Sequence, residues 1–393
     1  MQNRIIRYLI ILIFSVSPIS LSAQEVMPRI NFAGRGLVSL NGTRTLSPAN
    51  TSDFSSQNDF SDSFALFQLD KRLYHLSRAG MIIGLQFPDA ESDLGQVYFH
   101  QVNTFWNAEH WGVRLGRTRM QNTLLEFPTF RDDDLVEYAF VNNAFSNSEA
   151  SEFQQYGNVL NVNYFTWSSK LRLGIHLENQ TETTPNGEIV QEFQTNTAGA
   201  QVEYSLPDAV RFDGIIRQIG AGFTQQFVDA SNLSTVSNAY LSAAVNLDLN
   251  PVSHWELRGQ SILTLGDDSG DISTILSRSR ANAISVATSL RYLRNPYQMP
   301  RFQAALTFAA KSFTDAGEVQ WSMIPNLFYQ IGAQVDLGLQ YQYTDYSGDL
   351  AAAYGTQSDQ SIKLALIFNF DMTFNNYFSD RNSILNMEHG YIP

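Results

Sequence analysis

A strict two-residue alternation of apolar and polar side chains constrains the fold of this chain more than any other feature. Residues 335–343 carry valine, leucine or tyrosine at every second position, with aspartate, glycine or glutamine between them. Residues 170–178 and 362–370 alternate in the same way. Successive side chains of a β-strand point to opposite faces, so each window predicts a strand with one apolar face and one polar face.

Similar windows recur along the whole chain and predict about sixteen strands of about ten residues, the length that a tilted strand needs to cross a bilayer. The windows are 29–40, 64–74, 79–87, 97–106, 111–116, 159–165, 170–178, 198–206, 215–227, 241–249, 255–265, 284–292, 302–310, 321–329, 334–343 and 362–370. The predicted fold class is therefore all-β, a transmembrane antiparallel up-and-down barrel.

Composition supports a strand-based membrane protein and excludes several other classes. Only 16% of the residues are charged and the chain has no cysteine, whereas soluble domains carry about 25% charged residues. The mean hydropathy of −0.19 excludes a bundle of membrane-spanning helices. The net charge of −13 argues against nucleic acid as a partner, because such partners require a basic face.

The predicted connections sort by length along the chain. Short joins fall at 77–78, 107–110, 168–169, 207–211, 250–253, 295–298 and 331–332, whereas long polar joins fall at 41–62, 120–153, 179–195, 228–238, 266–280 and 344–360. The short and long joins alternate, which places tight turns at one end of the sheet and long loops at the other. A membrane barrel has this asymmetry, and a soluble sandwich has no reason to show it.

The N-terminal segment predicts a signal peptide over residues 1–23. Arg4 and Arg7 precede an apolar run at 8–16, and small residues lead to Ala23. The alternative is an uncleaved anchor, but the run is shorter than the roughly 20 residues of a spanning helix. The predicted organisation is a barrel over residues 24–378 and a periplasmic C-terminal tail over 379–393.

With this alternation, these turns and this leader, the chain resembles the Gram-negative outer-membrane porins. The resemblance implies an outer-membrane location, contact with lipid and lipopolysaccharide, a homotrimer, and a water-filled channel for passive diffusion of small polar solutes and ions, without a cofactor. It also implies an inward-folded loop after the fifth strand, here residues 120–153. One departure is that porins usually end on an aromatic strand residue, whereas this chain continues from Phe370 to Pro393.

Charged residues around this loop form the predicted pore constriction. The predicted constriction consists of Arg114, Arg117, Arg119, Glu126, Asp132, Asp133, Asp134 and Glu137, and further basic residues predicted to face the lumen are Arg35, Arg72, Arg172, Arg258 and Arg301. A basic wall that faces an acidic loop would orient dipolar solutes and filter ions. The alternative is that these charges form ion pairs that hold the loop to the wall.

Enzymatic function has little support in the sequence. The six histidines are dispersed, and none lies in a Gly-x-Ser-x-Gly or His-Glu-x-x-His context. No catalytic residue, metal site or cofactor is predicted. The second functional prediction is a structural or interaction subunit of an outer-membrane assembly, in which the barrel is a scaffold and the tail docks a partner.

Overall fold

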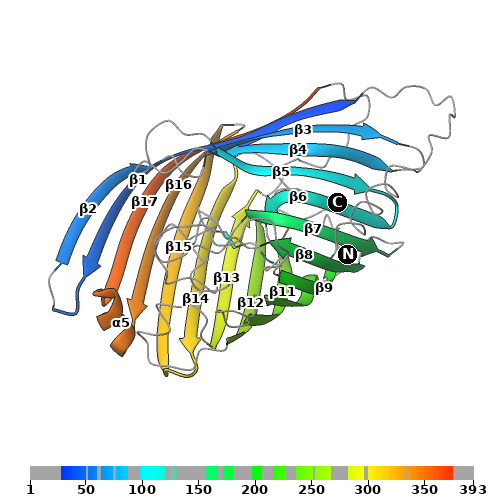
Figure 1. Ribbon diagram of the computed structural model, residues 1–393. Coiled ribbons are helices and arrows are strands. Elements are labelled where there is room, and N and C mark those ends of the chain that lie inside the picture. The colour runs from blue at the N-terminus through cyan, green and yellow to red at the C-terminus, as the bar shows by residue number, and fades with distance from the viewer. Residues whose placement is uncertain are drawn as a thin grey trace.

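The computed structural model shows one closed antiparallel sheet (Figure 1). It describes residues 28–49, 52–59, 63–73, 77–86, 98–119, 125, 127–128, 156–166, 171–179, 197–205, 216–226, 236–250, 253–266, 282–295, 300–332 and 334–374. The strands are β1 (Arg29–Leu46), β2 (Ser52–Asp59), β3 (Phe64–Arg72), β4 (Arg78–Gln86), β5 (Tyr98–Asn107), β6 (Trp111–Arg119), β7 (Tyr156–Phe165), β8 (Leu171–Asn179), β9 (Thr197–Ser205), β10 (Ile216–Gln226), β11 (Val236–Asn250), β12 (Ser253–Gly266), β13 (Ala283–Arg294), β14 (Phe302–Phe313), β15 (Glu318–Gly332), β16 (Val335–Tyr346) and β17 (Ser358–Phe374).

The barrel closes between its first and last strands. From β3 to β17 each strand pairs with its neighbours in sequence, and β1 pairs with β17 from Ile30 opposite Phe374 to Leu46 opposite Ser358. Figure 1 shows these two strands side by side. A closed barrel has no sheet edge, which removes the unpaired backbone groups that an open sheet would expose.

The seventeen strands fill sixteen positions around the barrel, which confirms the predicted count. Both β2 and β3 pair with β1, β2 along its C-terminal part and β3 along its N-terminal part. Between the two ladders, Leu37 N donates to Ser63 Oγ at 2.8 Å, and Ser63 Oγ donates to Leu37 O at 3.1 Å. The serine side chain thus satisfies the backbone groups of β1 at the point where the partner strand is interrupted.

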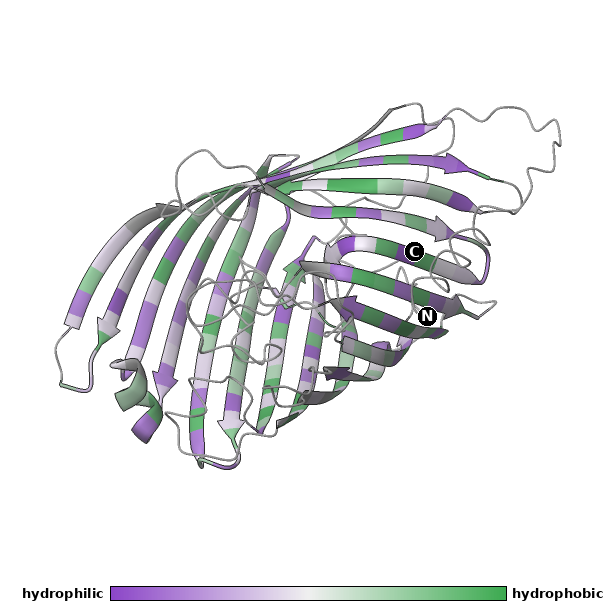
Figure 2. Ribbon diagram, in the orientation of Figure 1, coloured by the Kyte–Doolittle hydropathy of each residue, from purple (hydrophilic) through white to green (hydrophobic). Residues whose placement is uncertain are grey.

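The two faces of the sheet have opposite polarity, as the alternation predicts. In β8, Leu173, Ile175 and Leu177 are 45–61% exposed on the outside. On the inside, Arg172 and Glu178 are at most 8% exposed. Figure 2 shows the same alternation along most strands. Soluble proteins bury apolar side chains, so an apolar belt on the outside and polar groups on the inside indicate lipid around the barrel and water within it.

Apolar packing also occurs on the inner face of the sheet. Leu66 of β3 and Ile82 of β4 are buried together with Phe105 of β5. On β11, the ring of buried Tyr240 lies directly opposite Gly222 of β10 and contacts the space that a Cβ there would occupy. Such an aromatic ring over a glycine fixes the register between neighbouring strands.

The predicted loop at 41–62 is largely wrong. There β1 continues to Leu46 and forms a hairpin with β2, which extends the sheet beyond the predicted windows. Most residues at 41–46 and 52–59 are polar. Backbone pairing with β17 as well as β2 sustains these polar strands, although they lack the apolar alternation on which the prediction depended.

Most other connections follow the predicted asymmetry, but the join from β9 to β10, predicted to be short, spans residues 206–215 and is longer than the join from β10 to β11 at 227–235. Joins such as β5 to β6 and β11 to β12 are short, and the joins from β6 to β7 and from β8 to β9 are long. A second departure is the tight turn at 314–317 between β14 and β15, at the long-loop end. We refer to the two ends of the barrel below as the short-turn end and the long-loop end.

The predicted loop at 344–360 contains a short helix, α5 (Gly348–Tyr354), which Gly355 ends in the left-handed conformation. Among the described residues, no helix is long and apolar enough to span a membrane. The predicted signal peptide at 1–23 and tail at 379–393 lie outside the described residues, so those two boundaries stay predictions.

Candidate pore-lining site

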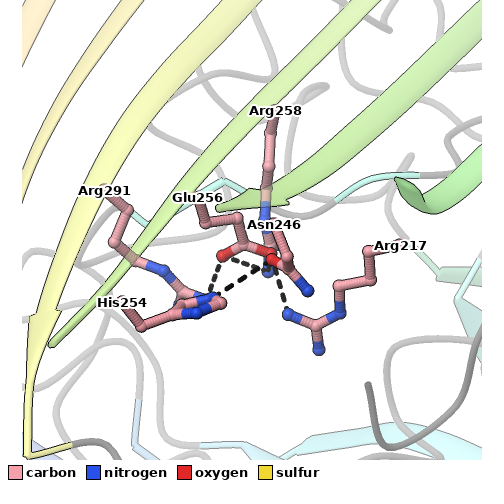
Figure 3. A network of polar contacts seen from close by, with 6 residues as sticks. All are labelled: Arg217, Asn246, His254, Glu256, Arg258 and Arg291. Carbon is pink, nitrogen blue, oxygen red and sulfur yellow. Dashed lines mark hydrogen bonds and ion pairs between the residues drawn. The ribbon is translucent and has the colours of Figure 1, made fainter. Parts of the chain in front are cut away.

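The most densely charged place on the described inner wall is a cluster of three arginines around Glu256 (Figure 3). The Glu256 carboxylate is fully buried. It accepts a hydrogen bond from Arg217 Nη1 at 2.8 Å and two from Arg258 Nη2 at 3.0 and 3.2 Å. Arg291 Nη2 donates to its other face. The four side chains carry a net charge of +2.

Strand alternation directs two of the three arginines inward. Glu256 and Arg258 occupy consecutive inward positions of β12, because Leu257 between them is exposed on the outside. Arg291 stands directly opposite Glu256 on β13. Opposite charges at paired positions attract across the ladder, so this register stabilises the wall as well as concentrating charge.

The third arginine reaches the cluster through a β-bulge. In the β10–β11 ladder, Ile216 pairs with Val245 and Gln218 with Ala244, which leaves Arg217 without a position of its own. An extra residue of this kind interrupts the alternation and re-aims a side chain. Ile216 is exposed outside and Gln218 is buried inside, and Arg217 joins the inward set.

Two further arginine–carboxylate clusters lie on the inner wall. Asp70 Oδ2 accepts hydrogen bonds from Arg78 Nη2 at 2.5 Å and Arg29 Nε at 3.3 Å. Arg172 Nη2 lies 2.5 Å from Glu203 Oε2. These three clusters, together with buried Arg114, lie in the half of each strand nearest the short-turn end. We call the arginines of this group the arginine belt: Arg29, Arg78, Arg114, Arg172, Arg217, Arg258 and Arg291.

A short described part of the predicted inward loop contacts the inner wall above the Glu256 cluster. Leu125 N donates to Gln260 Oε1 at 3.2 Å. Phe127 packs against an apolar patch of β13, β14 and β15, and Asn326 of β15 donates to the carbonyl of Pro128. Strand β6, which precedes this segment in the chain, lies six strands away from β12, whose Gln260 residue 125 contacts.

The predicted constriction residues do not share one location in the structure. Arg114 is inward and 3% exposed, and its Nη1 donates to Thr118 Oγ1 at 3.5 Å. Arg117 instead stands opposite outward-facing Val102 in the ladder. The backbone of Arg119 ends β6 opposite Tyr156. The predicted carboxylates Glu126, Asp132, Asp133, Asp134 and Glu137 lie outside the described residues.

The predicted lumen-facing basic residues occupy inward positions of the sheet or its rim. Arg172 and Arg258 belong to the arginine belt. Arg35 stands opposite Asn369 of β17 on the inward side. Arg301, before β14, donates from Nε to Gln330 Oε1 at 3.1 Å, and exposed Arg72 ends β3 opposite Arg78.

Sequence reasoning missed Arg29, Arg78 and Arg217 as site residues. Arg29 and Arg78 lie at strand ends, and only the register reveals that both contact Asp70. Arg217 has the wrong parity for a regular strand. The described residues contain no group of three or more histidine, aspartate or glutamate side chains that could hold a metal ion.

Comparison with known proteins identifies the fold. No family model matches the sequence, and no curated protein matches it. Solved structures do match over nearly their full length. The outer membrane channel DcaP of Acinetobacter baumannii aligns at 11% identity and a TM-score of 0.57, over 89% of this chain and 99% of that chain. The anion-selective porin from Comamonas acidovorans aligns at 11% identity and 0.58, over 87% and 100%.

OmpF of Salmonella typhi, solved in complex with daunomycin, aligns at 12% identity and a TM-score of 0.57, over 86% of this chain and 97% of that chain. Identities this low carry information about architecture alone. The chain therefore has the fold that these outer-membrane porins share.

Proposed function

We propose that this protein is an outer-membrane channel for passive diffusion of small polar solutes and ions. The observation that carries the proposal is the closed barrel of sixteen positions with an apolar outside and a polar inside. Barrels of eight strands fill their interior with side chains, whereas barrels of about sixteen strands leave an aqueous channel. A polar inner wall without lipid contact can be hydrated, so water-soluble molecules can pass along it.

Aromatic pairs on the outer face support a membrane position. Near the short-turn end, the rings of Trp111 and Tyr164 lie 5.0 Å apart, and those of Trp255 and Tyr292 lie 4.9 Å apart. Tryptophan and tyrosine favour the interface between hydrocarbon and water, where the ring is apolar and its polar atom stays hydrated. Outer-membrane barrels have short periplasmic turns and long extracellular loops, so we assign the short-turn end to the periplasmic interface and the long-loop end to the cell exterior.

The constriction is proposed to form where the segment around Phe127 meets the inner wall. Its contacts with Gln260, Asn326 and the apolar patch support an inward-folded loop at 120–153. The net positive charge of the Glu256 cluster supports a preference for anions. The proposed assembly is a homotrimer, and one protein of similar fold, OmpT of Vibrio cholerae, has been solved in a trimer form.

Planar-bilayer recording tests the proposal. The folded protein, inserted into a bilayer, is expected to give discrete conductance steps, and a salt gradient across the bilayer is expected to give a reversal potential on the anion-selective side. Folded barrels that insert but never conduct would contradict the channel. The scaffold function depends on residues 379–393, so deleting 380–393 and measuring conductance and co-purifying partners separates the two functions.

A further inference from the structure

We propose that a hollow on the outer face of β12 to β16 binds an acyl chain of one phospholipid from the periplasmic leaflet of the outer membrane, and that Arg294 binds the phosphate of the same lipid. The inference rests on the orientation of the barrel given with the proposed function, and it does not depend on conduction. It adds a lipid site on the outside of the wall to the channel inside it.

The hollow contains two short side chains of the outer face, Ala304 of β14 and Pro325 of β15, each between buried neighbours or beside an exposed leucine. Longer side chains stand around them, among them Trp255, Tyr292 and Tyr341. The volume of the hollow is about 440 Å³, within the range of about 300 to 1,000 Å³ that is typical of ligand pockets. Figure 1 shows β12 to β16 side by side.

Pro325 interrupts the sheet beside the hollow. Proline has no N–H to donate to a ladder, so it is rare in the middle of a sheet. Pairing between β15 and β16 stops after Met323 and resumes at Asn326, which leaves the two residues between them without partners on β16. The proline ring reaches less far from the backbone than a leucine or tyrosine would, so this position stays low between its taller neighbours.

The hollow opens toward hydrocarbon, nearer the short-turn end than the long-loop end. Trp255 and Tyr292, the aromatic pair of the short-turn end, line it. Trp321 and Tyr343, whose rings lie 5.3 Å apart, stand beyond it toward the long-loop end. Tryptophan and tyrosine favour the two membrane interfaces, so the hollow lies between them at the depth of acyl chains. The leucines that line it are 43–47% exposed on the outer face: Leu290, Leu306, Leu327 and Leu339.

Arg294 supplies a positive charge at the short-turn edge of the hollow. Alternation along β13 puts Leu290, Tyr292 and Arg294 on the same outer side, and Arg294 is exposed. It therefore lies one outward position, about 7 Å, beyond the tyrosine that lines the hollow. A guanidinium there can donate charge-assisted hydrogen bonds to phosphate oxygens. A phospholipid of the periplasmic leaflet has its phosphate at this level and its chains deeper, whereas the phosphates of lipopolysaccharide lie at the exterior side.

Native mass spectrometry of the folded protein tests the site. The protein in detergent is incubated with phosphatidylglycerol, and the detergent is then stripped in the instrument. We expect one phosphatidylglycerol molecule to stay bound to each chain. Lipid A added in equal amount should not displace it, and displacement by lipid A would overturn the assignment to the periplasmic leaflet.

Two variants locate the bound lipid. Ala304→Phe fills the hollow with a ring and keeps the outer face apolar. Each methylene expelled from an apolar site lowers affinity about fourfold, so losing two or more should weaken retention at least about tenfold. Arg294→Gln should weaken retention about fivefold, the effect of one basic residue at a membrane surface. The matched control is Ala200→Phe, which adds the same ring to the exposed outer face of β9, opposite exposed Ile175, and should retain the lipid as the wild type does.

The outcomes separate this site from the proposed channel, because residue 304 faces away from the lumen and Ala304→Phe should conduct as the wild type does. A conducting channel that retains no phosphatidylglycerol overturns the site, and so does equal loss of lipid in Ala304→Phe and Ala200→Phe. Loss of an oligomer instead of lipid in Ala304→Phe would assign the hollow to a second copy of the chain and overturn the proposal. Where Ala304→Phe fails to fold, unchanged retention in Arg294→Gln contradicts it. A folded barrel that retains the lipid without conducting would refute the channel and keep the site.

Discussion

Replacing Glu256 by glutamine tests the energetics of the arginine cluster directly. The substitution keeps the shape of the side chain and removes the negative charge with which all three guanidinium groups pair. A unit pair about 3 Å apart is worth about 5 kcal/mol at an effective dielectric constant of about 20, and about 1.4 kcal/mol in bulk water. Removing one partner of a buried ion pair costs about 3 to 5 kcal/mol.

The exposed fractions of the three arginine side chains indicate how strong each ion pair with Glu256 is within this range of energies. The side chains of Arg258 and Arg291 are 16% and 19% exposed, whereas that of Arg217 is 40% exposed. We therefore expect Glu256→Gln to lower the free energy of unfolding by about 3 kcal/mol. Coupling between Glu256 and Arg291 should be about 2 kcal/mol, and coupling between Glu256 and Arg217 below about 1 kcal/mol, as for exposed pairs.

Urea unfolding of the barrel in detergent micelles, followed by tryptophan fluorescence, measures these quantities. A double-mutant cycle for each pair isolates its coupling energy from the effects of the single substitutions. The reasoning fails in either of two cases. In the first, Glu256→Gln unfolds at the wild-type urea concentration. In the second, the coupling energy between Glu256 and Arg217 equals that between Glu256 and Arg291, which would show that burial does not determine the strength of these ion pairs.

Three further substitutions test the outer face, the inner packing and the loop contact. Leu339→Arg places a charge on the outer face of β16 and should lower the free energy of unfolding in lipid by about 2 to 4 kcal/mol if residue 339 lies near the bilayer midplane. Gln342→Arg places the same charge on the inner face and should lower it far less. Unfolding of both variants in lipid vesicles compares the two values. In Gly222→Ala the new Cβ collides with the tyrosine ring that covers this glycine, so the free energy of unfolding should fall by about 1 to 3 kcal/mol. In the control Gly259→Ala the new Cβ meets nothing within 4 Å, so the free energy of unfolding should not change in this way. Equal urea unfolding of the two variants would contradict the prediction. Phe127→Ser releases the loop segment from its apolar patch and should raise single-channel conductance or its noise; a wild-type trace would show that this contact does not narrow the pore.

The barrel could be predicted from sequence because membrane strands repeat one simple rule. Windows such as 335–343 alternate so regularly that a one-residue error in register would turn every apolar side chain into the lumen. The ends of the strands could be predicted less well from the sequence. Residues 41–46 continue β1 through backbone pairing on both sides, and backbone hydrogen bonds carry no sequence signature.

The charged wall could be predicted only in part. Parity predicted that Arg172 and Arg258 face the lumen, and in the structure each lies in a regular strand with a carboxylate partner on the inner wall. Parity alone could not show that Asp70 would meet two arginines, since those contacts depend on which strand ends become neighbours. The same parity puts Arg117, three residues after inward-facing Arg114, on the outer side, opposite outward-facing Val102.

The two irregular places described here, in β10 and along β1, show what a barrel does when alternation fails. Along β1, the partner strand is interrupted, and Ser63 restores both hydrogen bonds of Leu37 with a single hydroxyl. In β10, the extra residue is not compensated in this way. It carries a guanidinium to a carboxylate on the second strand along, at 2.8 Å. A bulge interrupts a ladder and re-aims a side chain, and here it brings a third guanidinium group to the Glu256 carboxylate, which regular alternation along β10 would have directed elsewhere.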